Sequence, residues 1–236
     1  MRTPDFLILG AQKCGTSAAR HNLAQHPHVR FNTNANEHRE EVHFFDNDHN
    51  WARGIQWYAA QFQQPAPLLG DKTPNYLAPR CIERIRVTLP GARLIVLLRN
   101  PVARAYSHWN HFNRNPASGN GRWRIRAFEN ALQENPTLQR NGEYATSIAL
   151  LQEYFPPALL GVWITERMQA NHAAEHARML KFLGLAPHTQ TTLQHRHTRQ
   201  YDETMRPATR ARLEQYFAAP NDRLRALLND PIPEWP

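Results

Sequence analysis

The chain has 236 residues, with 28 lysines and arginines against 20 aspartates and glutamates, which gives a net charge of +8. Cys14 and Cys81 are its only cysteines, too few for a disulfide framework or a cysteine-based zinc site. No apolar run approaches the ~20 residues that cross a membrane. The short apolar run at residues 6–9 follows Asp5 and leads into a glycine, unlike a secretory signal, so we expect a cytoplasmic protein.

The positive charge is spread along the chain, and no signature of a DNA- or RNA-binding module accompanies it. This pattern favours an anionic small ligand over a nucleic acid. Lysine occurs only at positions 13, 72 and 181, while arginine is frequent. Because an ammonium is a compact point charge and a guanidinium a planar fork, Lys13 and Lys72 indicate sites that need compact charge. The histidines show no convincing metal-ligand spacing, so no metal site is expected.

Hydrophobic patterning predicts alternating strands and helices. We expect strands at residues 5–9, 68–70, 93–98 and 159–164, and helices at 16–25, 51–62, 79–89, 101–112, 142–155, 172–183 and 207–228. Residues 30–50 are expected to be irregular around the apolar patch 42–45, and residues 113–124 to form a loop. This order predicts one α/β domain over residues 1–236, a P-loop-like three-layer sandwich with a central parallel sheet.

The first motif, residues 10–17, joins a predicted strand to a predicted helix. Gly10 and Gly15 have the spacing of a nucleotide P-loop, but Thr16 stands where that pattern requires lysine. Backbone N–H groups at such a turn and at the helix start attract an anion. Thr16 and Ser17 add hydroxyl donors, and Lys13 adds a point charge inside the loop. The alternative is a plain glycine turn between strand and helix.

The second motif follows the strand at residues 93–98. A P-loop ATPase or GTPase holds Mg²⁺ partly with an acidic residue after such a strand, but here Arg99 follows it. If residues from 101 onward are helical, Arg104 and Ser107 lie on one face, where Ser107 joins Arg99 at one anion. Two phosphate sites without a magnesium ligand fit a nucleotide with phosphates at two positions, such as 3′-phosphoadenylyl sulfate (PAPS).

Four segments, in order, resemble PAPS-dependent sulfotransferases. LGAQKCGTSAARHNLAQHP is similar to their 5′-phosphosulfate loop, and LLRNPVARAYSHW to their 3′-phosphate motif. EVHFFD at 41–46 and DKTPNY at 71–76 are similar to catalytic segments of the heparan-sulfate-type branch. EYATSIALLQEYFP and LEQYFAAPNDRLRALL also match patterns of the family, so the resemblance covers most of the chain.

The resemblance implies a role for each matching position. The loop residues Lys13, Cys14, Gly15, Thr16 and Ser17 would bind the 5′-phosphosulfate of PAPS. Arg99 and Ser107 would bind its 3′-phosphate. Glu41 would be the general base for the acceptor hydroxyl, and Lys72 would stabilise the sulfonate and the bridging oxygen. His43 also falls at a family position near the chemistry.

Sulfonyl transfer needs in-line geometry and stabilisation of charge more than covalent catalysis. Lys13 and Lys72 supply positive charge where the bridging oxygen becomes anionic. A base must reach the acceptor proton. Glu41 and His43 share a face if their segment is extended, so the choice between these two bases stays open, with Glu41 preferred. The alternative for this segment is an edge strand with a solvated glutamate, and for Lys72 a turn lysine.

Further residues are assigned to nucleotide and acceptor. His197, Arg199 and Tyr201 are predicted to contact the nucleotide, with a surface loop as the alternative. The residues predicted to line an acceptor groove are Trp51, Trp57, Arg122 and Trp123, with packing as the alternative for the tryptophans. Two positions depart from the heparan-sulfate branch. Ser17 replaces an arginine used near the saccharide, and Cys14 replaces a glycine. The resemblance therefore implies PAPS as donor but not heparan sulfate as acceptor.

We therefore predict a metal-independent sulfotransferase. It would move a sulfonate from PAPS to a hydroxyl of a glycan, glycolipid or small molecule and release adenosine 3′,5′-bisphosphate (PAP). The alternatives are a P-loop nucleotide or small-molecule kinase, and a non-catalytic protein that binds PAPS or PAP. No nucleic-acid or membrane-spanning partner is predicted. The acceptor, the choice between O- and N-sulfation and the oligomeric state are not specified by the sequence.

Overall fold

The computed structural model describes residues 2–32, 40–114, 127–188 and 205–235. The chain divides into two compact units, and each unit is made of two separate segments. Residues 1–98 with 149–197 form the first unit, and residues 99–148 with 198–236 form the second. The expectation of a single domain over residues 1–236 stays a prediction.

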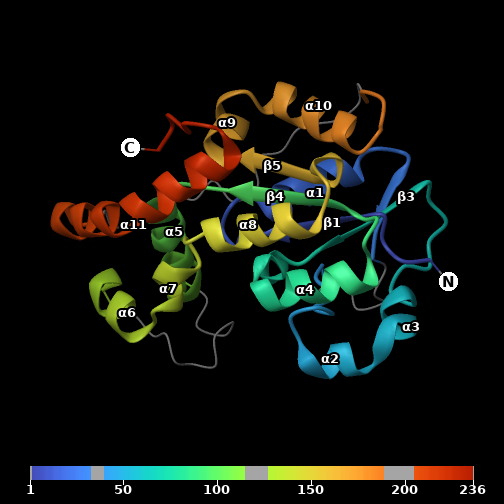
Figure 1. Cartoon of the computed structure of the whole chain (residues 1–236), viewed down its shortest axis with the longest axis horizontal. Helices are drawn as coiled ribbons and strands as arrows, with labels where there is room; N and C mark the ends of the chain where they lie inside the picture. The colour runs from blue at the N-terminus through green and yellow to red at the C-terminus, as the bar shows by residue number, and fades with distance from the viewer. Residues whose placement is uncertain (1, 33–39, 115–126, 189–204, 236) are drawn as a thin grey trace. The chain divides into compact units, whose positions relative to one another are not determined.

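Five parallel strands form the sheet of the first unit (Figure 1). They are β1 (Phe6–Gly10), β2 (Val29–Phe31), β3 (Leu68–Lys72), β4 (Arg93–Leu98) and β5 (Leu160–Ile164), in the spatial order β2-β3-β1-β4-β5. Every residue of the central strand β1 is buried. A parallel strand covered on both faces has no solvent side, which explains its unbroken apolar sequence.

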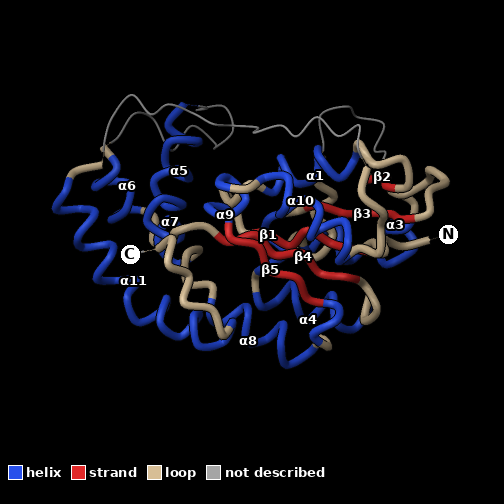
Figure 2. The backbone as a smooth tube through the Cα atoms, turned by 90° about the horizontal axis from the view of Figure 1, so that it is seen from above, coloured by secondary structure: helices blue, strands red, loops and turns tan. Residues whose placement is uncertain are grey.

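Helices cover both faces of this sheet, so the predicted three-layer α/β architecture is confirmed. Helices α1 (Thr16–Ala24) and α10 (His172–Phe182) lie over one face, and α4 (Pro79–Thr88) lies over the other (Figure 2). The other helical segments of this unit are α2 (Asp48–Ala52), α3 (Gly54–Ala59), η1 (Pro74–Leu77), η3 (Pro157–Leu159) and α9 (Thr165–Ala170).

The order of the strands determines where this sheet binds ligands. From β1 the chain passes to β2 and β3 on one side, and it then returns to β4 on the other side of β1. Such a reversal leaves a crevice beyond the carboxyl ends of parallel strands, where ligands bind in open α/β sheets. Gly10 ends β1 and Lys72 ends β3. Both predicted lysine motifs therefore lie at this edge.

The second unit contains α5 (Pro101–Arg114), α6 (Phe128–Glu134), α7 (Thr137–Arg140) and α11 (Pro207–Leu228), while α8 (Ala145–Tyr154) begins in it and ends in the first unit. Its apolar core includes Trp109, Phe128 and Phe217. Arg104 is also fully buried in this unit, where its guanidinium donates to the Leu138 carbonyl and lies 3.3 Å from Nδ1 of His108. Residues 101–114 are helical as predicted, so Arg104 and Ser107 lie one turn apart on α5, and the described contacts of Arg104 are with internal polar groups.

Most differences from the expected elements have local causes. The helix expected at 51–62 is instead α2 and α3, which meet at Gly54 with its positive φ of 79°. The side chain of Asn47 starts α2 early by accepting from the N–H groups of His49 and Asn50. Strand β2 was missed because it has only three residues, and α6, α7 and α9 were missed because they are short. Among the helices of the described residues, none is long and apolar enough to cross a membrane.

Candidate active site

The predicted phosphate loop connects β1 to α1 and is held in a fixed shape. Gly10 has a φ of 141°, and a Cβ there would lie 2.5 Å from the carbonyl oxygen of Pro74, so this position requires glycine. The N–H of Ala11 donates to the Leu97 carbonyl at 2.7 Å. The hydroxyl of Thr165 lies 2.9 Å from the Cys14 carbonyl and 2.8 Å from the Leu98 carbonyl. The loop is thus attached to the ends of β4 and β5.

The start of α1 is available to an anion. Gly15, with a φ of 87°, is the residue before the helix, and among the described residues no side chain caps it. The first N–H groups of a helix have no partner within the helix. Thr16 is buried, whereas Gly15 is exposed and Ser17 is half-buried. Lys13 adopts the left-handed conformation inside the loop, with a φ of 69°.

Cys14 has a structural role in this loop. Its side chain is fully buried, and its N–H donates to the Ala11 carbonyl at 3.2 Å. Its Sγ lies 3.6 Å from the carbonyl oxygen of Gln12. These contacts use the thiol and the amide within the loop, so Cys14 helps to hold the shape of the loop.

Lys72 lies at the end of β3 with a side chain only 1% exposed. Its ammonium donates to Oε1 of Glu41 at 2.7 Å and lies 3.6 Å from Oε2 of Glu40. A buried ammonium requires such partners, because removal from water otherwise costs several kcal/mol. This lysine is therefore not a solvated turn residue, and the glutamate is not a solvated edge residue.

The preceding residue, Asp71, points to the other face of β3, as successive residues of a strand do. It is fully buried and accepts a hydrogen bond from the hydroxyl of Tyr58 at 2.8 Å. Burial raises the pKa of Asp71 to about 6, although the hydrogen bonds from Tyr58 and Tyr76 act in the opposite direction. The end of β3 therefore places a cation on the site side and a weakly acidic carboxyl in the core.

His43 lies between two carboxylates. Its Nδ1 is 2.8 Å from Oδ2 of Asp46, and its Nε2 is 3.2 Å from Oε2 of Glu41. The hydrogen bond to Asp46 and then that to Glu41 raise the pKa of His43 to about 10, against the opposing effect of burial. The ring is therefore an imidazolium at neutral pH, with both nitrogens donating.

The structure distinguishes the two candidate bases by their charge states. Burial raises the pKa of Glu41, but the hydrogen bond from His43 and the charge of Lys72 outweigh burial and hold that pKa below its usual value. Glu41 is thus an ionised carboxylate with lone pairs, and His43 has no free lone pair. The condition of an extended segment is not met, since His43 has a φ of 52°. The two side chains meet because the backbone turns there.

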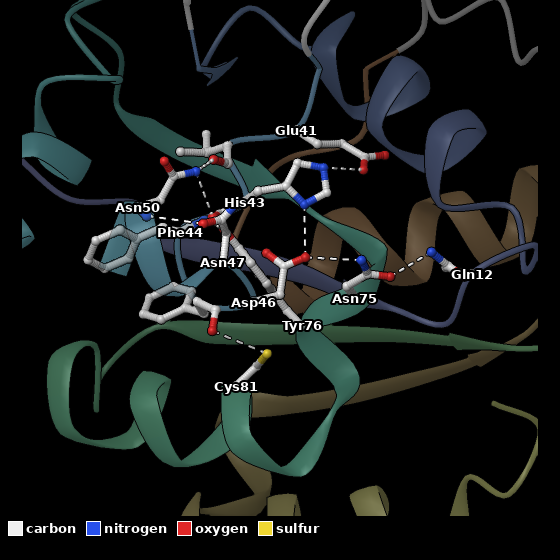
Figure 3. A network of polar contacts seen from close by, with 12 residues as sticks. Gln12, Glu41, His43, Phe44, Asp46, Asn47, Asn50, Asn75, Tyr76 and Cys81 are labelled. Carbon is white, nitrogen blue, oxygen red and sulfur yellow. Dashed lines mark hydrogen bonds and ion pairs between the residues drawn. The ribbon is translucent and has the colours of Figure 1, made fainter. Parts of the chain in front are cut away.

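A polar network connects this cluster to the phosphate loop (Figure 3). Asp46 also accepts from the amide of Asn75, and Asn75 accepts from the amide of Gln12. Asp46, Asn75 and Gln12 had no predicted role, although all three lie inside the motifs recognised in the sequence. The spacing of Asp46, three residues after His43, was the available signal.

One open pocket of about 610 Å³ combines these features. Its lining residues come from the start of α1, the acid–base cluster and helices α2 and α3: Ser17, Glu40, Glu41, Val42, His43, Asn47, Asn50, Arg53, Trp57 and Lys72. The guanidinium of Arg53 lies over the Trp57 ring, 4.3 Å from its centroid. Trp51, predicted to bind the acceptor, does not line this pocket. It packs against Phe44 and lies under the guanidinium of Arg84.

The remaining predicted residues lie elsewhere in the chain. Arg99 directly follows β4 and is half-buried, and its carbonyl accepts from the hydroxyl of Tyr144 at 2.9 Å. Ser107 is half-buried on α5. Both belong to the second unit. Five further predicted residues lie outside the described residues: Arg122, Trp123, His197, Arg199 and Tyr201. Within the described ranges, no group of three or more histidine, cysteine or acidic side chains could hold a metal ion.

Comparison with known proteins identifies the family. Residues 3–216 match the model of the sulfotransferase domain family. The chain belongs to this family. The resemblance drawn from the four motifs is therefore confirmed, and the kinase alternative is set aside.

Two sulfotransferase structures share this fold. A crystal structure of a sulfotransferase from Alicyclobacillus acidocaldarius superposes with a TM-score of 0.81 at 23% identity, covering 100% of this chain and 99% of that one. The mouse sulfotransferase SULT7A1, complexed with PAP, gives a TM-score of 0.54 at 15% identity, covering 80% of this chain and 61% of that one. At these identities the likeness concerns the fold alone.

Sequence relatives belong to the heparan-sulfate branch that the motifs indicated. The mouse bifunctional heparan sulfate N-deacetylase/N-sulfotransferase 3 is 35% identical over 203 residues, which cover 79% of this chain and 23% of the relative. The chain thus spans about a quarter of the length of the curated relatives it matches. This sulfotransferase domain corresponds to one part of those larger enzymes.

Proposed function

We propose that this sulfotransferase uses PAPS as sulfonate donor and transfers the sulfonate to a hydroxyl group. The observation that carries the proposal is the shared pocket. It brings Ser17 at the start of α1 together with the ionised Glu41 and the buried Lys72. An anion site and a carboxylate base facing one cavity meet the two requirements of sulfonyl transfer, namely charge stabilisation and removal of a proton.

PAPS supplies the sulfonate, and residues of the chain hold it and remove the acceptor proton. Lys13, Gly15, Thr16 and Ser17 bind the 5′-phosphosulfate through the loop and the start of α1. Glu41 takes the proton of the acceptor hydroxyl as its oxygen forms a bond to sulfur. The bond between sulfur and the bridging oxygen breaks, and the electron pair leaves with PAP. Lys72 and Lys13 offset the negative charge that develops on that oxygen.

The 3′-phosphate of the donor is assigned to Arg99 and Ser107 because their motif resembles that of the family. Arg199 and Tyr201 remain predicted nucleotide contacts, and Arg122 and Trp123 remain predicted acceptor contacts. The reaction is proposed to need no metal, since positive charge comes from lysine side chains. A cytoplasmic location remains part of the proposal.

The acceptor end of the pocket suits a polyhydroxylated molecule, such as a glycan, a glycolipid or a hydroxylated small molecule. Asn47 and Asn50 line this end. The Asn47 oxygen caps α2 and the Asn50 nitrogen donates to two backbone carbonyls, so the Asn47 nitrogen and the Asn50 oxygen are the groups for an acceptor, beside part of the Trp57 ring. Arg53 is exposed on the same wall. Aromatic faces bind the apolar side of a sugar ring, and amides bind its hydroxyls.

Replacement of Glu41 by glutamine tests the proposal. The wild type should release PAP from PAPS in an acceptor-dependent manner with EDTA present, measured over a panel of neutral and acidic oligosaccharides and phenols. Glu41→Gln should lower kcat by about 10²–10⁴-fold, since the amide cannot accept the proton. The Kd for PAP, measured by calorimetry, should differ by no more than a few-fold between Glu41→Gln and the wild type. Glu153→Gln, at an exposed position on α8, is the matched control.

Each alternative gives a different result. A non-catalytic PAP-binding protein would bind PAP tightly in both forms and show no turnover. Absence of PAP binding by the wild type would contradict the assignment of the donor. Retained turnover in Glu41→Gln would contradict the assignment of the base.

A further inference from the structure

We propose that Gln12 and Asn75 are positioning residues that couple the phosphate loop to the general base, through Asp46 and His43. This inference rests on the proposed function, because it assigns the loop to the donor and Glu41 to the acceptor proton. Gln12 lies in the loop between Ala11 and Lys13, and Asn75 lies in η1, which follows β3.

The contacts form one continuous path (Figure 3). Nε2 of Gln12 donates to Oδ1 of Asn75 at 2.6 Å, and Nδ2 of Asn75 donates to Oδ2 of Asp46 at 3.0 Å. The same Asp46 oxygen lies 2.8 Å from Nδ1 of His43. His43 in turn reaches Glu41 with Nε2. Four hydrogen bonds thus connect a loop side chain to the carboxylate that removes the proton.

The direction of each hydrogen bond is fixed by the carboxylate. An ionised aspartate only accepts, so Asn75 must present its NH₂ group to Asp46. The carbonyl oxygen of Asn75 then faces Gln12, which must donate. Neither amide group can turn over without breaking a hydrogen bond to its neighbour. A displacement of the Gln12 side chain is therefore transmitted through Asn75 to Asp46.

Other contacts hold the segment of His43 and Asp46 from its remaining sides. The amide of Asn50 donates to the carbonyls of Val42 and His43 at 3.3 and 3.0 Å. The hydroxyl of Tyr76 accepts from the N–H of Phe44 at 2.8 Å. These contacts fix the backbone, whereas Asn75 contacts the Asp46 side chain itself.

Asp46 is well placed to transmit a change. Its side chain is 11% exposed, and its second oxygen, Oδ1, is buried without a hydrogen-bond partner among the described residues. Asn75 and His43 share the other oxygen, so loss of the Asn75 donor leaves the carboxylate held by the His43 contact alone and easier to rotate. Rotation withdraws it from His43 and changes the orientation of the ring at Glu41.

The loop and η1 also contact each other directly. A Cβ on Gly10 would lie 2.5 Å from the carbonyl oxygen of Pro74, the residue before Asn75. A change of loop shape when the donor binds therefore reaches η1 both through packing and through Gln12. The consequence is that the base reaches its working orientation when the donor site is filled.

Two near-isosteric variants remove the polar groups of the path. Gln12→Met removes the donor to Asn75, and Asn75→Leu removes the donor to Asp46. Each should lower kcat on the order of tenfold, the scale expected when a catalytic group is misplaced. The Kd for PAP and the KM for PAPS should stay within about twofold. The double variant should cost no more than the larger single effect, because both residues act through one path. Gln64→Met, at an exposed loop position, is the control.

NMR of His43 gives a readout that a merely structural role would not move. The chain has 13 histidines, so the His43 ring signal is assigned with a His43→Gln variant. Saturating PAP should shift this signal in the wild type, and the shift should fall by at least half in Gln12→Met.

The outcomes are decisive for the coupling. The coupling would be overturned if PAP shifted the His43 signal equally in the wild type and in Gln12→Met. It would also be overturned if Gln12→Met and Asn75→Leu kept the wild-type kcat. A parallel loss of PAP affinity and kcat would overturn it as well, because Gln12 would then be a ligand of the donor. Failure of the wild type to bind PAP would instead contradict the proposed function.

Discussion

At the scale of single residues, the site is built from compensating charges. The cations Lys72 and His43 lie against Glu40, Glu41 and Asp46. His43 is held as an imidazolium by two carboxylates, so on the proposed function it would orient and stabilise Glu41. Glu41 contacts both cations, and its basicity is therefore lowest while both contacts hold. On the proposed function, the anionic sulfonate would compete for Lys72, which would make the carboxylate a better base at the moment of transfer.

Arg53 is a candidate determinant of acceptor charge. Its guanidinium lies over Trp57 on the pocket wall and forms no ion pair within the described residues. Arg53→Leu should raise the KM for an acidic oligosaccharide about tenfold, as expected for loss of one solvent-exposed charge-assisted hydrogen bond. The KM for a neutral oligosaccharide of equal length should not change. Arg212→Leu, exposed on α11, is the control. Equal losses for both acceptors would show that Arg53 contributes packing and not charge recognition.

At the scale of elements, the sequence was informative where the pattern is local. Unbroken apolar runs predicted β1 and β4, and helical spacing predicted α11 over residues 207–228. Strand β2 was not predictable, because three residues carry no period and β2 is held by pairing with β3. The helix expected at 51–62 failed because Gly54 takes a positive φ.

The same distinction applies to the site. Lys13, Glu41 and Lys72 were identified from motifs that can be read along the chain. The roles of Asp46 and Asn75 depend on η1 folding back against the segment after Val42, which only tertiary structure determines. Trp51 and Trp57 lie six positions apart, and spacing alone did not show which one lines the pocket.

Helix α10 carries a buried histidine that makes the packing of α1 against α10 sensitive to acid. His176 is 7% exposed, and its Nε2 has no hydrogen-bond partner among the described residues. Burial, and then the nearby His172 and His26, lower the pKa of His176 to about 4. His172 contacts Asn22 of α1 at 3.0 Å, and the His26 ring contacts those of His28 and His188.

Replacing His176 should reduce the acid sensitivity of folding. In the unfolded chain His176 binds a proton at its ordinary pKa near 6.5, but in the folded chain only near pH 4. The free energy of unfolding is therefore unaffected by His176 above pH 6.5 and decreases as the pH falls from there toward 4. At pH 5 this histidine costs about 2 kcal/mol of unfolding free energy. The free energy of unfolding, measured by urea titration, should fall between pH 7.5 and pH 5. In His176→Leu this fall should be smaller than in the wild type by about this amount. His49→Leu, at an exposed position, should decline like the wild type. An undiminished decline in His176→Leu would show that other groups cause the acid sensitivity.

At the scale of the whole chain, the net charge of +8 is distributed over both units and not concentrated in one block. The first unit contributes the described loop, base and pocket, and the second contains Arg99 and Ser107. The two motifs are assigned to different phosphates of the donor, so a nucleotide with both phosphates should stabilise the chain more than one with the 5′-phosphate alone. This gives the 3′-phosphate assignment a measurable consequence.

PAP and AMP differ in the 3′-phosphate that is assigned to Arg99 and Ser107. At a concentration of 100 Kd, PAP should raise the free energy of unfolding by about 2.7 kcal/mol. For a chain of this size that corresponds to a rise in Tm of roughly 5–10 °C. At the same concentration AMP should give a much smaller rise, because it lacks the phosphate that is assigned to Arg99. In Arg99→Ala the two nucleotides should give nearly equal, small rises in Tm, measured by thermal unfolding without magnesium.

Arg223→Ala, exposed on α11, is the control and should keep the wild-type difference between PAP and AMP. If Arg99→Ala still prefers PAP over AMP, the 3′-phosphate is bound elsewhere, and the motif after β4 has a structural role.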